Sequence, residues 1–116
     1  MVLAISSDFY LEGFRKILSS QRDIEVVAET LEYLEIIPLL KRVKHDILLL
    51  DTAIPNLNIV SILESVKEKS PDTKVLLFVN IANLISLGVQ ECLTSRSSEE
   101  EFIRAIRAVS EGKTLT

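Results

Sequence analysis

The sequence predicts a doubly wound α/β domain whose parallel sheet has five strands in the order 2-1-3-4-5. Short apolar runs alternate with stretches of helical apolar spacing five times, which is typical of a parallel sheet with right-handed crossovers. The central run, Ile47–Leu50, leads directly into Asp51, with Pro55 four residues later. Such a run indicates a strand covered on both faces. With 116 residues and 47% hydrophobic content, the chain suits a single globular domain over 1–116.

The first half of the chain is expected to contain three strands and two helices. The strands are predicted at Val2–Ile5, Ile24–Ala28 and Ile47–Leu50. A helix over Phe9–Ser20 follows Asp8, which we expect to cap it. A second helix over Leu34–Lys44 contains Pro38, which a helix tolerates in its first turn because amide donors there have no partner inside the helix.

The second half is expected to supply the remaining two strands. The third helical stripe consists of Ile59, Ile62, Leu63 and Val66, after Asn58 as a cap and before Pro71. Strands follow at Lys74–Val79 and Gln90–Thr94, and the short span Asn80–Val89 between them predicts a shortened fourth helix. The last helix begins at a capping box, where Ser97 precedes Glu100 or Ser98 precedes Glu101, and ends before Gly112.

Composition excludes several classes of function. A net charge of −4 argues against nucleic-acid binding by this segment, which would need a basic face. The single cysteine, Cys92, excludes an internal disulfide and is expected to be a buried apolar side chain. His45, the only histidine, is expected to be a solvated turn residue. The chain has no signal-peptide pattern and no long apolar span, so we expect a cytoplasmic protein without a membrane partner.

Asp51 lies where function is expected in this architecture. Ligands of open parallel sheets bind in the crevice beyond the carboxyl ends of the strands. Ser6 and Ser7, at the start of the first helix, could cradle a phosphate group at the same edge. The residues alone leave two interpretations open: Asp51 takes part in chemistry, or its hydrogen bonds hold a turn at the end of a strand.

Four stretches resemble a known family. They are, in chain order, Glu12–Gly13–Phe14, Asp23–Val27, Ser70–Val75 and Glu100–Gly112. They are similar to the EGL, DIEVV, SPDTKV and EEL-x-x-AIRAV-x-x-G stretches of NarL/FixJ-type response-regulator receiver domains, which usually carry a LuxR-type DNA-binding tail. The resemblance implies a flavodoxin-like receiver fold, Asp51 as phosphoacceptor, a histidine kinase as phosphate donor, bound Mg²⁺ and a DNA-binding tail in any longer protein.

The residues that support phosphorylation in this family match poorly. The family's acidic pair after the first strand is matched by Ser6 and Ser7, with only Asp8 acidic, so Mg²⁺ is expected to bind weakly to Asp8 and Asp51. The family's Thr or Ser is matched by Val79, its Lys by Ser95 with Arg96 adjacent, and its aromatic switch by Cys92. One well-placed donor contributes roughly 3–4 kcal/mol to such a transition state. These losses predict phosphorylation that is slower by orders of magnitude.

Three hypotheses follow. In the first, the chain is a degenerate receiver without enzyme activity that regulates transcription by binding proteins, as a homodimer, through its fourth crossover, fifth strand and last helix. Leu84, Ile85 and Leu87 in that crossover are either core residues or an exposed partner surface. In the second, it is a functional phosphoreceiver in which Asp8 and Arg96 substitute for the missing groups. In the third, it is a flavodoxin-like domain that binds a small ligand at the Ser6–Asp8 loop.

Overall fold

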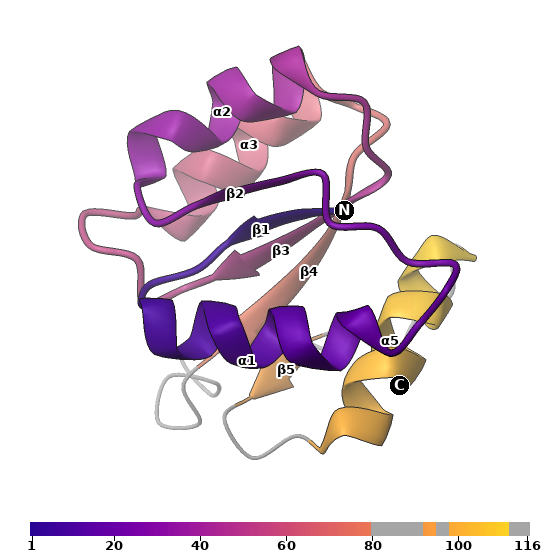
Figure 1. Ribbon diagram of the computed structural model, residues 1–116. Helices are drawn as coiled ribbons and strands as arrows, with labels where there is room; N and C mark the ends of the chain where they lie inside the picture. The colour runs from indigo at the N-terminus through magenta and orange to yellow at the C-terminus, as the bar shows by residue number, and fades with distance from the viewer. Residues whose placement is uncertain (80–91, 95–97, 112–116) are drawn as a thin grey trace.

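The computed structural model describes residues 1–79, 92–94 and 98–111 (Figure 1). The strands are β1 (Val2–Ala4), β2 (Ala28–Thr30), β3 (Ile47–Asp51), β4 (Lys74–Val79) and β5 (Cys92–Thr94). The helices are α1 (Asp8–Ser19), α2 (Tyr33–Arg42), α3 (Ile59–Lys69) and α5 (Glu99–Ser110). All strand pairs are parallel and the order is β2-β1-β3-β4-β5, as predicted. The shortened helix predicted between β4 and β5 lies outside the described residues.

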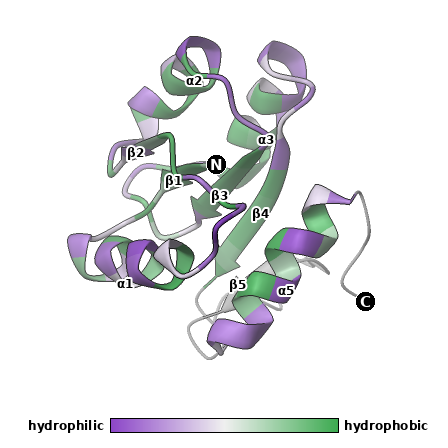
Figure 2. Cartoon of the chain, turned by 45° about the vertical axis from the view of Figure 1, so that its right-hand side comes forward, coloured by the Kyte–Doolittle hydropathy of each residue, from purple (hydrophilic) through white to green (hydrophobic). Residues whose placement is uncertain are grey.

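The sheet separates two layers of helices, with α1 and α5 on one face and α2 and α3 on the other (Figure 1). Alternate side chains of each central strand enter opposite cores. Leu49 and Leu76 pack on the α1/α5 side, whereas Leu48, Leu50 and Leu77 pack on the α2/α3 side. Both faces of the strands are therefore apolar, which explains the unbroken hydrophobic runs in the sequence (Figure 2).

The second strand lies further along the chain than Ile24–Ala28, where we predicted it. β2 begins only at Ala28, because Ala28 pairs with Val2 and Val2 is the first residue of β1. Ile24 and Val26 still contribute apolar side chains to the α1/α5 core. The β-branched composition of this segment therefore reflects packing against the core rather than membership of the strand.

Two helical details also differ from expectation. Ser7, not Asp8, caps α1, since its hydroxyl accepts a hydrogen bond from the Tyr10 amide at 3.4 Å, and Asp8 is the first helical residue. Pro38 lies in the interior of α2 rather than in its first turn. Pro38 has no amide hydrogen to donate to the Leu34 carbonyl, four residues earlier. Both residues are exposed, so this carbonyl lies on the solvent side of the helix.

His45 is not the solvated turn residue that we expected. The ring is half-buried, its Nδ1 donates to the Val43 carbonyl oxygen at 2.8 Å, and its Nε2 lies 2.7 Å from the Thr73 hydroxyl oxygen. Thr73 also contacts the hydroxyl of Ser70 at 2.6 Å. The histidine therefore connects the turn before β3 to the turn before β4. None of the helices that the structure describes combines the length and apolar character needed to cross a bilayer.

The capping box of α5 provides a test of local stability. The Ser98 hydroxyl accepts from the Glu101 amide at 3.1 Å, and the Glu101 carboxylate accepts from the Ser98 amide. We expect Ser98→Ala to lower the free energy of unfolding by about 1 kcal/mol. Ser61→Ala, an exposed position in the first turn of α3, is the control and should change it by less than about 0.5 kcal/mol. Urea denaturation measures both, and equal effects would contradict the assignment.

Candidate functional site

Asp51 is the last residue of β3 and lies at the carboxyl edge of the sheet, where the sequence placed the site. Its side chain is only 3% exposed. One carboxylate oxygen, Oδ2, accepts from the Ser6 amide at 2.9 Å, and the other, Oδ1, accepts from the Ala53 amide at 2.9 Å. The carboxylate therefore joins the loop after β1 to the turn after β3, and both of its oxygens already have a donor.

An aromatic group lies beside this carboxylate. Phe78 pairs with Asp51 in the parallel ladder, so the two side chains point to the same face of the sheet. The Phe78 ring makes edge contacts with Tyr10 at 5.2 Å and with Phe14 at 5.1 Å between centroids. Phe78 and Tyr10 were not among the site residues that the sequence predicted, and only the register between β3 and β4 could have indicated Phe78.

The end of β4 supplies no polar group to the site. Val79 is fully buried and packs in the core under α2 and α3, as an apolar side chain in place of a hydroxyl. Thr52 follows Asp51 and donates its amide to the Phe78 carbonyl at 3.0 Å. Its hydroxyl oxygen is buried and has no partner among the described residues. The Thr52 hydroxyl, on the residue after Asp51, therefore follows β3 and not β4.

The predicted site residues are only partly brought together. Ser6 contacts Asp51 through its backbone amide, and the Ser7 hydroxyl is occupied in capping α1, so neither group is free to cradle a phosphate in the predicted way. Asp8 is exposed in the first turn of α1. Ser95 and Arg96 lie outside the described residues, and only the backbone of Cys92 is described.

The residues around Asp51 fit a magnesium site poorly. Magnesium requires several hard oxygen ligands in octahedral geometry, commonly carboxylates and waters. In the described ranges, no three or more histidine, cysteine or acidic side chains come together as a metal-binding group. Both oxygens of Asp51 accept amide hydrogen bonds. Asp8, the other carboxylate predicted to bind magnesium, is exposed.

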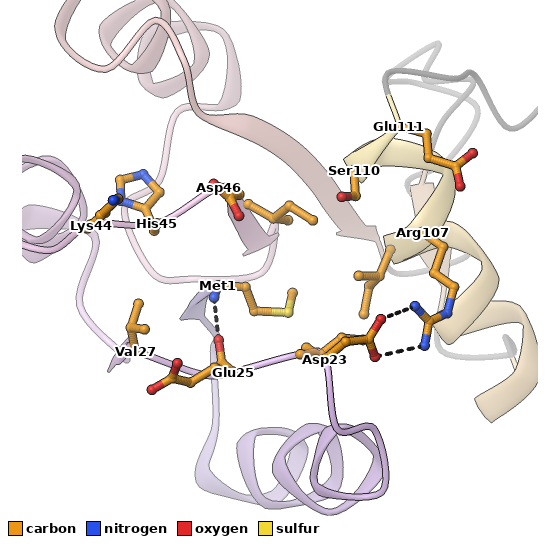
Figure 3. A pocket seen from close by; sticks show the side chains of 13 residues that line it. Met1, Asp23, Glu25, Val27, Lys44, His45, Asp46, Arg107, Ser110 and Glu111 are labelled. Atoms are coloured by element: carbon orange, nitrogen blue, oxygen red, sulfur yellow. Dashed lines mark hydrogen bonds and ion pairs between the residues drawn. The ribbon is translucent and has the colours of Figure 1, made fainter.

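A hollow lies at the amino edge of the sheet, opposite the edge that carries Asp51 (Figure 3). Its volume is about 400 Å³ and it is bordered by Met1, the segments 23–27 and 44–47, and the end of α5. Arg107 of α5 closes one side through two bonds to the Asp23 carboxylate, at 2.6 and 3.1 Å, and one to the Gln21 amide oxygen at 2.8 Å. The fork geometry of the guanidinium suits this paired contact.

Charge and burial set the pKa values at this edge. Hydrogen bonding from the Arg107 guanidinium lowers the pKa of the Asp23 carboxyl below its ordinary value, and the same bond raises the pKa of Arg107. Burial lowers the pKa of the Met1 amino group, which donates to the Glu25 carbonyl. Since Arg107 and Asp23 are both exposed, their ion pair orients α5 rather than contributing much stability.

Comparison with known proteins agrees with this fold. No protein-family model matches the chain. It is 27% identical over 121 residues to the uncharacterized transcriptional regulatory protein YxjL of Bacillus subtilis. The aligned region covers 99% of this chain and 56% of that protein. It is 30% identical over 109 residues to the oxygen regulatory protein NreC of Staphylococcus epidermidis, covering 88% and 50% respectively. The chain thus spans about half the length of the curated relatives it matches.

Solved structures provide the geometric comparison. The isolated REC domain of RcsB from Salmonella enterica serovar Typhimurium has a TM-score of 0.82 at 18% identity, covering 99% of this chain and 90% of that one. The chain has a receiver fold. This is the flavodoxin-like receiver architecture that the resemblance implied. The curated relatives are named as transcriptional regulatory proteins and response regulators, among them VraR of Staphylococcus aureus, which is 27% identical over 109 residues.

The two amides held by Asp51 predict a structural role that can be measured. Asp51→Ala should lower the free energy of unfolding by about 2 kcal/mol, because it leaves two part-buried backbone donors without their acceptor, and Asp51→Asn should lower it less because one acceptor oxygen remains. Amide hydrogen exchange at Ser6 and Ala53 should accelerate in both variants. The control, Asp46→Ala, removes an exposed carboxylate at the other end of β3 and should change stability little. Similar losses for Asp46→Ala and Asp51→Ala would contradict this role.

The ion pair at the amino edge predicts a pH effect. Because the pKa of Asp23 is lower in the folded chain, its contribution to stability is complete above the ordinary carboxyl pKa and is lost as the pH falls through the lowered value. Arg107→Gln should return the pKa of Asp23 toward the ordinary value, measured by carbon-detected NMR titration. Lys16→Gln, which removes a cation without a bond to Asp23, should leave that pKa in place. An unchanged pKa in Arg107→Gln would refute the assigned cause.

Proposed function

We propose that this chain is a degenerate receiver domain that regulates transcription by protein–protein contact, with impaired or absent phosphorylation of Asp51. One observation carries the proposal: the carboxylate that the resemblance makes a phosphoacceptor is buried and accepts one backbone amide on each oxygen. Phosphorylation would convert one of these oxygens into the bridging atom of an acyl phosphate. The amide bonded there would then lose a charged acceptor.

The surroundings of Asp51 support the same proposal. Phosphoryl transfer is catalysed by positioning and by neutralisation of charge on the equatorial oxygens. The neighbouring strand contributes Phe78 and Val79, which have no charge and no donor in their side chains. The loop after β1 contributes Ser6 and Ser7 in place of an acidic pair, so magnesium is proposed to bind only weakly, at Asp8 and Asp51.

A homodimer is part of the proposal. We place its contact on the face made by the fourth crossover, β5 and α5, of which α5 is the described helix. Arg104 is exposed on α5 and Ile103 is half-buried beside a groove shared with α1. RcsB, which has the same fold, has been solved as dimers bound to DNA. A histidine kinase partner, a DNA-binding tail and a cytoplasmic location are likewise proposed, from the family that the sequence resembles.

A functional phosphoreceiver is the alternative. Asp51 at the end of β3 favours it, because an acidic residue stands at the phosphoacceptor position of the resemblance. In that case Asp8 and Arg96 would substitute for the missing groups. The structure supplies no described cation near Asp51 to neutralise a phosphoryl group, which is why we prefer the degenerate receiver.

The two functions differ in a direct measurement. After incubation with acetyl phosphate and Mg²⁺, intact-mass spectrometry should find the unmodified mass, because phosphoryl transfer with release of acetate requires charge neutralisation, and the residues described around Asp51 supply no positive charge. A variant carrying Val79→Thr and Ser95→Lys, with Ser7→Asp, rebuilds the family's groups and should gain phosphate faster if it folds. A clean gain of one phosphoryl group by the unaltered chain, abolished by Asp51→Asn, would overturn the proposal in favour of the alternative.

A further inference from the structure

The outer face of α2 carries exposed apolar side chains beside the half-buried Ile37, which packs against the core. Leu34 is 71% exposed, Pro38 is exposed, and Ile37 is half-buried between them. Because these residues are spaced three and four apart, they form one stripe along the helix, and Lys41 continues it. Single exposed leucines are ordinary in monomers, but here the stripe is continuous with a hollow.

That hollow lies between α2 and α3. It has a volume of about 470 Å³, and its apolar lining includes Tyr33, Leu34, Ile37, Leu57 and Ile62. The two helices lie side by side on the face of the sheet opposite α1 and α5 (Figure 1). The stripe and the hollow therefore form one continuous surface on the side away from the proposed α5 contact, with a projecting leucine beside a depression. The depression has an apolar part and a polar part, the latter made by Asn56, Asn58, Ser61, Ser65 and Lys69.

The charges along α2 favour one occupant of this surface. Glu35 lies in the first turn, where its carboxylate also accepts a hydrogen bond from the Thr30 hydroxyl at 2.9 Å, and Lys41 and Arg42 lie in the last. Glu35 and Arg42 are seven residues apart, two helical turns, and so lie on the same flank of the stripe. A uniformly acidic or basic partner would be attracted to one end of this helix and repelled at the other. An antiparallel copy of the same helix places each acidic end beside a basic end.

We propose that α2 is a self-association surface, on which a second copy of this chain docks antiparallel about a two-fold axis near Pro38. Each Leu34 enters the hollow between α2 and α3 of the other copy. Glu35 of each copy lies beside Lys41 and Arg42 of the other. An isologous contact of this kind is self-complementary and closes as a dimer. It uses a different face from the α5 contact and is independent of whether Asp51 is phosphorylated.

Cysteine cross-linking tests the contact directly. In a Cys92→Ser background, Pro38→Cys places a thiol near the two-fold axis, and oxidised glutathione should convert it to a disulfide-linked dimer on a non-reducing gel. Val60→Cys, 67% exposed on α3 and outside the surface, is the control and should cross-link at least tenfold more slowly. Equal rates for the two thiols would overturn the proposal.

Sedimentation velocity tests the apolar and charged parts separately. Leu34→Glu should raise the dissociation constant of the α2 contact at least tenfold, whereas Val60→Glu should leave it unchanged. Glu35→Lys and Arg42→Glu should each weaken the contact, and the double variant should restore it. Loss of self-association in Arg104→Glu, with no effect of Leu34→Glu, would overturn the α2 contact and support the α5 dimer instead. A heterologous occupant would appear as a monomeric chain that does not cross-link, which also overturns the proposal.

Discussion

The hydrogen bonds of the Asp51 carboxylate are the constraint on which the carboxyl edge of the sheet depends. A charged group that is almost completely buried is very unfavourable unless each oxygen has a partner. Here the amides of Ser6 and Ala53 supply those partners, from two different loops. The loop after β1 and the turn after β3 are consequently fixed relative to each other. Removal of the carboxylate would leave both loops with unsatisfied donors.

This arrangement changes what the edge of the sheet can do. In an open parallel sheet, the crevice beyond the strands is where ligands bind. In this chain Asp51 lies beside Phe78 in the parallel ladder, and the Phe78 ring contacts the rings of Tyr10 and Phe14. An aromatic neighbour excludes water and offers no donor to a phosphoryl group. The Asp51 carboxylate also links two backbone segments, through the amides of Ser6 and Ala53.

The sequence predicted those features that depend on local patterns. The strand Lys74–Val79 and the Asn58 cap of α3 match the structure because a bounded apolar run and a capping residue each suffice to define them. The position of β2 could not be predicted, because Ile24 and Val26 pack on the core before the ladder begins. Phe78, the aromatic neighbour of Asp51, was also not predicted, because their pairing depends on the register of two strands and joins residues 27 positions apart in the sequence.

The two edges of the sheet suggest where recognition takes place. At the carboxyl edge the Asp51 carboxylate is bonded to the amides of Ser6 and Ala53, and the buried Thr52 hydroxyl has no partner among the described residues. At the amino edge Arg107 is bonded to Asp23, and both ring nitrogens of His45 have partners. Polar groups that are already paired gain little from a new ligand, because each new bond replaces one that exists. The exposed apolar stripe of α2 has no such internal partner, so burial there would be a net gain. In this receiver fold, the helical faces are therefore better suited to recognition than the edges of the sheet.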